Sequence, residues 1–218
     1  MKIFQRIFHK DKGWDASVPF SKMTPQLVLA FGNRELLESE SPARDLRNTY
    51  PAAQIVGCST AGEIQGTSVL ENSLVATCIQ FDATRVKTAE AQVENSTQSI
   101  QAGATLAREL MAPDLTHVFV LSDGLNVNGS ALVEGLAENL PMRVAITGGL
   151  SGDGAQFKRT LVLHNGTARE GRIVAVGFYG NKLRVGYGSL GGWDTFGPER
   201  HITKSIGNVV YELEHFQI

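Results

Sequence analysis

The sequence of 218 residues has few cysteines and no long apolar run. Its two cysteines, Cys58 and Cys78, lie inside apolar strand-like segments, where a reduced thiol in the core is the usual state. No stretch approaches the roughly 20 apolar residues that span a bilayer. The charged start MKIFQRIFHK lacks the roughly 7–15 apolar residues of a signal-peptide core. We therefore expect a cytoplasmic protein without disulfides or membrane spans.

The sequence also lacks a charge imbalance and the common ligand motifs. It has 20 basic and 22 acidic side chains and a net charge of -2, so we expect neither nucleic acid nor an anionic membrane as a partner. No histidine pair has zinc-like spacing, and no Asp/Asn alternation resembles a calcium loop, so we expect no metal. The glycine-rich stretch 147–159 lacks the Gly-Lys-Ser/Thr ending of a P-loop, which argues against nucleotide binding.

What is present is an internal repeat. An apolar run at 25–33 is followed by a polar helical stretch and a second apolar run that ends in VGCSTAGE. An apolar run at 115–124 opens the same series, which ends in ITGGLSGD. Alignment without a gap matches Pro51 with Pro141, Val56 with Ile146, Gly62 with Gly152, and Glu63 with Asp153. The acidic residue after a glycine thus recurs.

The repeat predicts the fold class. Each copy, at about 25–93 and 115–188, reads strand, helix, strand, glycine-rich turn and hairpin, and a helix at about 97–111 joins the copies. The hairpins are predicted at 74–89 and 173–188. We predict one α+β domain over 1–218, with mixed sheets covered by helices. A four-layer αββα sandwich is the simplest arrangement, and a single long mixed sheet is the alternative.

Glycine-rich turns at strand ends are the candidate ligand site. Such turns present backbone N–H groups where open α/β sheets bind ligands. Because the repeat makes the first and third turns equivalent, we expect them to line a common groove. The four glycine clusters are residues 57–63, 122–129, 147–154 and 188–194.

Cys58 is the alternative centre of chemistry. Thiol catalysis needs a base and an orienting carboxylate nearby, and the N–H groups of the turn could serve as an oxyanion hole. None of the five histidines stands in a recognised nucleophile-base spacing, and Gly148 replaces Cys58 in the second copy. We therefore expect no enzyme and no catalytic residue, with thiol-dependent hydrolysis or acyl transfer at Cys58 as the alternative.

The motifs in their order resemble the N-terminal domain of the FIST family. They are VGCSTAGEI, VLSDGLNVNGSALVEGL, ITGGLSGDG, VGFYG and GYGSLGGWDTFGPER, and the resemblance covers about 25–213. It implies a bacterial sensory domain of signal transduction that binds a small molecule such as an amino acid. Some members are haem proteins that sense nitric oxide, so a haem-binding sensor is an alternative; otherwise we expect no cofactor. Family members usually continue into a second, C-terminal domain, which we do not expect within these 218 residues.

The family motifs fall on the glycine clusters, and we interpret their residues as ligand contacts. For an amino acid, N–H groups would hold the carboxylate, and Glu63, Asp123 or Asp153 the ammonium group. Further expected partners are a second copy of the chain and a signalling output protein such as a histidine kinase, a cyclase or phosphodiesterase, or a chemoreceptor. The predicted ligand-binding residues are Cys58, Ser59, Thr60, Gly62, Glu63, Asp123, Gly124, Gly148, Gly149, Asp153 and Trp193.

Overall fold

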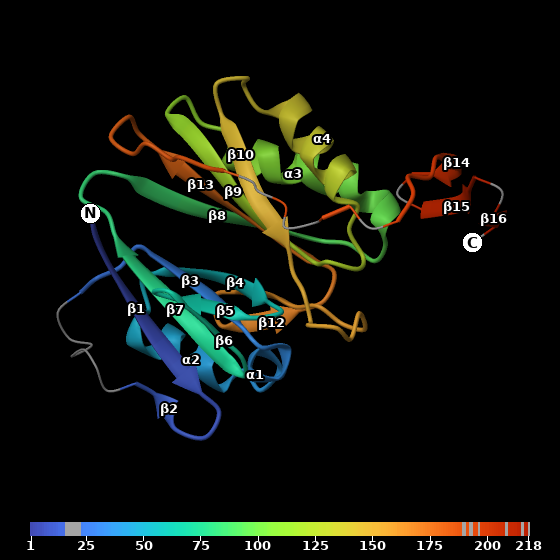
Figure 1. Cartoon of the computed structure of the whole chain (residues 1–218). Coiled ribbons are helices and arrows are strands. Elements are labelled where there is room, and N and C mark those ends of the chain that lie inside the picture. Colours follow the sequence, from blue (N-terminus) through green and yellow to red (C-terminus); the bar gives the residue numbers. More distant parts are fainter. Residues whose placement is uncertain are drawn as a thin grey trace. The chain divides into compact units, whose positions relative to one another are not determined.

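The computed structural model describes residues 1–15, 23–188, 191, 194–195, 197–207, 209–214 and 216–217 (Figure 1). The chain divides into a large unit, Met1–Val185, and a small unit, Gly186–Ile218. The small unit holds an antiparallel sheet of β14 (Ile202–Ile206), β15 (Val209–Leu213) and β16 (Phe216–Gln217). Among the described residues, none of the helices is long and apolar enough to cross a membrane.

The large unit contains two mixed sheets. The first has seven strands in the order β12-β11-β4-β3-β7-β1-β2, and β3 and β4 are its parallel pair. Its strands are β1 (Lys2–His9), β2 (Gly13–Trp14), β3 (Leu27–Gly32), β4 (Gln54–Ser59), β7 (Ser73–Gln80), β11 (Val162–His164) and β12 (Thr167–Arg169). A separate pair, β5 (Glu63–Gln65) and β6 (Ser68–Leu70), lies between β4 and β7 in the chain.

The second sheet has four strands in the order β10-β9-β13-β8, and β9 and β10 are its parallel pair. Its strands are β8 (Arg85–Gln92), β9 (Leu115–Ser122), β10 (Ala145–Leu150) and β13 (Arg172–Tyr179). The order and directions match those of β4-β3-β7-β1 in the first sheet. The registers agree as well, because Gly32 faces Leu74 in one sheet and Ser122 faces Ile173 in the other.

Helices cover the outer face of each sheet, and an apolar layer separates the sheets (Figure 1). The helices α1 (Arg34–Glu38) and α2 (Ser41–Thr49) pack on the first sheet through Leu37 and Leu46. The helices α3 (Ser99–Leu110) and α4 (Gly129–Asn139) pack on the second through Leu106 and Leu136. The layer between the sheets includes Val56, Cys58, Leu121, Val176 and Phe178. The α+β prediction is confirmed, and the layers run helices, sheet, sheet, helices.

The pair α3 and α4 depends on two glycines. A Cβ on Gly103 would lie 2.4 Å from the carbonyl oxygen of Leu132, and one on Gly135 would lie 2.0 Å from that of Ile100. Each glycine therefore lets the backbone of one helix touch the other, as small residues do where helices approach closely. This close packing fixes the layer that covers the second sheet.

The predicted hairpins at 74–89 and 173–188 are wrong. β7 pairs with β3 and β1, whereas β8, only four residues further on, pairs with β13 in the other sheet. Phe81 in the connection packs edge-on against Phe178 of the second sheet, with ring centres 6.0 Å apart, so the chain crosses instead of turning back. Residues 180–188 after β13 form no strand. Alternation of apolar residues identifies a strand but not its neighbour.

Candidate functional site

The first and third glycine-rich turns lie next to each other. The backbone N–H of Gly152 donates to the carbonyl oxygen of Ser59 at 2.8 Å. A Cβ on Gly152 would also lie 3.7 Å from the backbone nitrogen of Ala61. Because β4 and β10 run into these turns, the ends of two strands from different sheets meet here.

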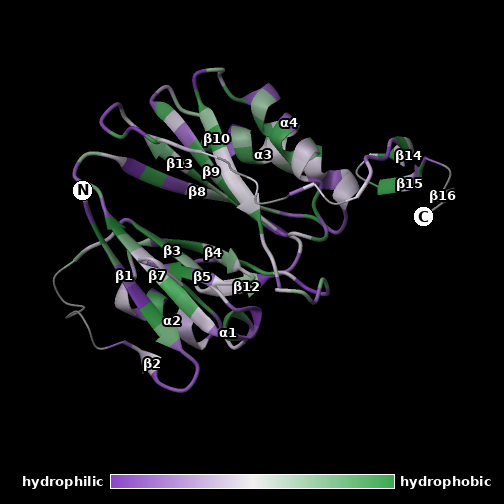
Figure 2. Ribbon diagram, in the orientation of Figure 1, coloured by the Kyte–Doolittle hydropathy of each residue, from purple (hydrophilic) through white to green (hydrophobic). Residues whose placement is uncertain are grey.

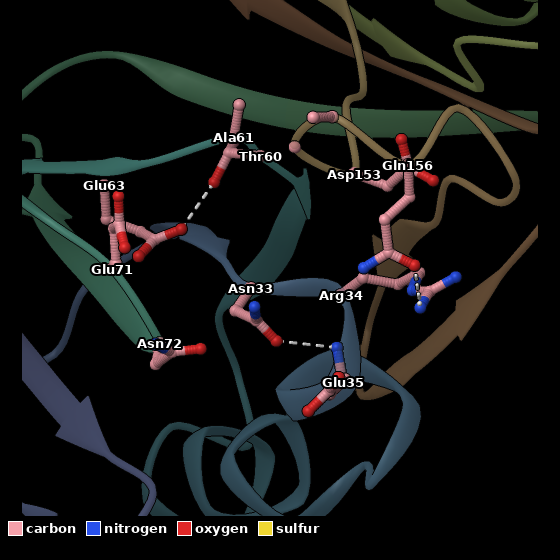
Figure 3. A pocket seen from close by; sticks show the side chains of 12 residues that line it. Asn33, Arg34, Glu35, Thr60, Ala61, Glu63, Glu71, Asn72, Asp153 and Gln156 are labelled. Atoms are coloured by element: carbon pink, nitrogen blue, oxygen red, sulfur yellow. Dashed lines mark hydrogen bonds between the residues drawn. The ribbon is translucent and has the colours of Figure 1, made fainter.

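A pocket of about 300 Å³ opens at this junction (Figure 3). That volume suits a small ligand. Four chain segments line the pocket: residues 33–35 at the start of α1, 60–63 of the first turn, 71–72 before β7, and 153–156 of the third turn. Of its twelve described lining residues, four are acidic and only Arg34 is basic.

Glu63 is a buried acid of this pocket. It is 2% exposed, and its carboxylate accepts hydrogen bonds from the hydroxyls of Thr60 and Ser73, each at 2.8 Å. Within the described part of the chain it forms no salt bridge. A carboxylate has about four acceptor positions, so two hydroxyls leave capacity for a donor from a ligand. A buried charge without a cation is costly, and an ammonium group would offset that cost.

Arg34 reaches from α1 toward the third turn. One guanidinium nitrogen, Nη2, donates to Oε1 of Gln156 at 3.1 Å (Figure 3). Nε lies 3.7 Å from Oε1 of Glu38. This Nε is buried and has no hydrogen-bond partner among the described residues. The preceding Asn33 positions the arginine, because its Oδ1 accepts the N–H of Glu35 at 2.8 Å and so caps α1.

Asp153 lines the pocket but mainly organises its own loop. Its carboxylate accepts the backbone N–H groups of Arg159, Lys158 and Phe157 at 2.8–3.0 Å. These bonds, that of Arg159 foremost, hold the pKa of Asp153 below its usual range. The carboxylate therefore shapes the turn that carries Gly154 and Gln156 into the pocket.

Three residues at or next to this pocket have positive φ. Asn72 and Phe157 have φ of 54° and 50°, and Gly154 has φ of 71°. Such angles are rare for residues with a side chain, and they occur most often at functional sites and in tight turns. Asn72 and Gly154 line the pocket. Phe157, which is 78% exposed, directly follows the lining residue Gln156.

Cys58 and Ser59 are predicted contacts that the structure places in the interior. Ser59 is fully buried, and its hydroxyl oxygen accepts the N–H of Leu161 at 2.9 Å. Cys58 is 3% exposed in the layer between the sheets, and burial raises the pKa of its thiol to about 12. A thiol in that environment remains protonated at neutral pH, which opposes the nucleophilic alternative.

The second turn lies apart from the described pocket lining. Asp123 is fully buried and accepts the backbone N–H groups of Leu125, Asn126 and Gly171 at 2.7–2.8 Å. Gly124 donates its N–H to the hydroxyl of Thr160 at 2.9 Å. Asp123 and Gly124 therefore hold the turn against its neighbours, and neither lines the pocket.

The remaining predicted residues are glycines and one tryptophan. Gly148 has φ of 156°, and a Cβ there would lie 1.9 Å from the carbonyl oxygen of Val120, so it permits close pairing of β10 with β9. Gly149 is exposed in the same strand, and a Cβ on Gly62 would lie 3.2 Å from Cγ1 of Val69. Trp193 lies outside the described residues.

Two of the described histidines, His117 and His164, have side-chain partners. His117 is 4% exposed and shares a hydrogen bond with the hydroxyl of Thr147 at 2.8 Å, and burial lowers its pKa. His164 contacts Oε2 of Glu90 and the hydroxyl of Thr88. Neither lines the pocket. In the part of the chain that the structure describes, no group of three His, Cys, Asp or Glu side chains could hold a metal ion.

The family model of the FIST N domain matches residues 26–215, which is most of the chain. The chain belongs to the FIST N domain family. FIST domains are sensory domains of signal transduction. No curated protein matches the chain. In this FIST N domain, the family match covers all four segments that line the pocket.

Sequence reasoning about this FIST N domain identified Thr60, Glu63 and Asp153 of the pocket lining and missed the others. Three of the missed lining residues have side-chain hydrogen bonds described above: Asn33, Arg34 and Gln156. They lie at the start of α1 and in the third turn. A usable signal existed for the first of them. Asn33 directly follows the glycine at the end of a strand and precedes a helix, the same context that singled out the other turns.

Proposed function

We propose that this FIST N domain binds a small amino acid in the pocket between its first and third turns, and that binding is the sensory event. The observation that carries the proposal is Glu63, a buried carboxylate that two hydroxyls orient and that no described cation neutralises. An ammonium group is the natural partner for such a carboxylate.

Arg34 supports the proposal through the contact it could make with the carboxylate of the amino acid. The carboxylate of an amino acid needs a donor opposite the acid that holds its ammonium group. Arg34 is the basic residue among those that line the pocket, and its Nε, which lies 3.7 Å from Oε1 of Glu38, has no hydrogen-bond partner among the described residues. A guanidinium recognises a carboxylate with directed N–H donors.

The route from binding to signal would be a shift between arrangements of the two halves. The pocket takes residues from the start of α1 in the first half and from the third turn in the second. A ligand that touches both sides stabilises the arrangement in which they are closest. We propose a signalling output protein as the receiver, and a cytoplasmic location and a homodimer remain predictions.

A thermal-shift screen of the twenty amino acids tests the binding. At about one hundred times its dissociation constant, a ligand stabilises by about 2.7 kcal/mol, which corresponds to about 5–10 °C here. Glu63→Gln should weaken binding about tenfold or more, because it removes the charge that faces the ammonium group. The exposed Glu134→Gln on α4 removes the same charge elsewhere and should leave affinity unchanged.

An amine analogue without the carboxylate separates the roles of the two residues. Its binding should respond to Glu63→Gln but not to Arg34→Gln, whereas a full amino acid should respond to both. The proposal fails when no amino acid at about 10 mM stabilises the protein, or when Glu63→Gln binds as tightly as the unchanged protein.

A further inference from the structure

A second hollow, of about 460 Å³, lies where the two sheets meet at the end of β8. Its lining residues come from three strands: Glu90, Ala91 and Gln92 of β8, Arg169 of β12, and Arg172 of β13. β12 belongs to the first sheet, whereas β8 and β13 belong to the second. The hollow shares no lining residue with the pocket of Glu63.

Arg172 is buried in this hollow with donor capacity left over. It is 4% exposed, and its Nη1 donates to the carbonyl oxygen of Thr167 at 2.6 Å. Its Nε lies 3.5 Å from Oε2 of Glu90. No hydrogen bond joins its Nη2 to any residue that the structure describes. A guanidinium offers five N–H donors, so Nη2 of Arg172 can still donate to a ligand.

The charges around the hollow are unequal. Burial has the largest effect on the pKa of Arg172 and lowers it. The carboxylate of Glu90 raises this pKa, and the guanidinium of Arg169 lowers it further. Glu90 also binds Nδ1 of His164 at 2.7 Å, so its charge is shared between two partners. The lining thus holds two guanidinium groups and one carboxylate that is already engaged. An added anion would relieve the repulsion between the arginines.

A neutral hollow of about 360 Å³ adjoins it at β8. The two share Ala91 and Gln92, and the second is lined besides by Val93 and by α3 and its preceding turn. The side chains there are uncharged, and three of them are the amides of Gln92, Gln98 and Gln101. β8 is the last strand of its sheet, so its backbone edge faces this space without a neighbouring strand among the described residues. Figure 2 shows β8 banded with hydrophilic residues, whereas β7 is mostly hydrophobic.

We propose that Arg169 and Arg172 form a second ligand site, which binds the carboxylate or phosphate group of a small metabolite whose uncharged polar body lies against Gln92, Gln98 and Gln101. The anion occupies the larger hollow and uses the free donors of the two arginines. Because Arg169 is on one sheet and Arg172 on the other, the bound anion ties the sheets together at the end of β8.

The test uses inorganic phosphate, glycerol 3-phosphate and glutarate as probes, with sodium chloride keeping ionic strength constant. Binding is followed by amide NMR shifts of Ala91 and Gln92 and by the unfolding midpoint. We expect saturable binding of a phosphate probe or of glutarate, and which of them binds distinguishes the two anions. Arg169→Gln should raise the dissociation constant about tenfold. Arg169 is exposed, so this variant should fold, unlike a change of the buried Arg172.

Two controls make the test decisive. Arg143→Gln removes an exposed arginine before β10, at the opposite edge of the same sheet, and should change the dissociation constant less than twofold. Gln98→Ala should weaken glycerol 3-phosphate but not inorganic phosphate, since only the former has a body to contact the amides. The proposal is overturned if no probe shifts the signals beyond the chloride reference, or if Arg169→Gln and Arg143→Gln bind the probes equally well. Amino-acid binding at Glu63 is unaffected by either outcome.

Discussion

The two sheets share an order of strands, but aligned residues in the turns of the two halves have different roles. Glu63 and Asp153 occupy aligned positions, and both line the pocket. The carboxylate of Glu63 accepts two side-chain hydroxyls, whereas that of Asp153 accepts three backbone N–H groups. One acid is left with capacity for a ligand, and the other is occupied in folding its loop. Duplicate positions can therefore divide binding and scaffolding between them.

The turns that follow β3 and β9 show the same division between binding and scaffolding. Asn33 and Asp123 are aligned, and each accepts the N–H of the residue two positions later, Glu35 or Leu125. Asn33 opens α1 beside the pocket, while Asp123 is fully buried and also binds Asn126 and Gly171. The local turn is common to both halves. The additional bonds make Asp123 part of the core, and that difference can be measured.

The largest effect should come from removing Asp123. Asp123→Ala leaves one buried and two part-buried N–H groups without an acceptor, and bonds to a charged group contribute about 1.5–3 kcal/mol each. We expect a loss of about 3–5 kcal/mol in the free energy of unfolding. Asn33→Ala removes only a helix cap and should cost about 1 kcal/mol. Urea denaturation of both variants checks this, and equal losses would remove the distinction between the turns.

A smaller effect should separate Asp153 from Glu63. The pKa of Asp153 is held low by backbone donors, so its ionised form stabilises the fold above the ordinary aspartate value of about 3.9. This stability is lost as the pH falls through the lowered pKa of the folded state. Asp153→Asn should therefore reduce stability at pH 6 and flatten its decline below about pH 4.

Urea midpoints measured between about pH 2.5 and pH 6 check that prediction. Glu63→Gln is the matched comparison, because it removes the aligned carboxylate. We expect it to weaken amino-acid binding. An unchanged pH profile in Asp153→Asn would mean that the three N–H bonds do not favour the ionised carboxylate.

The sequence predicted the helices and strands better than it predicted which strands pair with each other. The connecting helix at about 97–111 and the paired apolar runs are present, because period and composition report which face of an element is buried. Strand partners depend on tertiary contacts. Phe81 reaches the second sheet, and β8 follows it there, which alternation along β8 could not reveal.

The pocket was only partly predictable for a related reason. Turn residues such as Thr60 and Glu63 could be identified from glycine patterns, since these patterns mark where strands end. Arg34 could not, because its place depends on how α1 meets the third turn, 122 positions away at Gln156. Cys58 attracted attention through its chemistry, although its environment is that of a packing residue.

The smallest effect should come from Cys58, whose aligned partner is Gly148. Cys58→Ala removes one buried sulfur atom from the layer between the sheets and should cost about 1 kcal/mol. Amino-acid binding should not change. Since burial raises the thiol pKa to about 12 for Cys58 and about 11 for Cys78, the native protein should react slowly with a thiol reagent at pH 8 and quickly once unfolded in urea. Rapid labelling of native Cys58, abolished in Cys58→Ala, would show instead that the position is open to chemistry and would revive a nucleophilic role for the first turn.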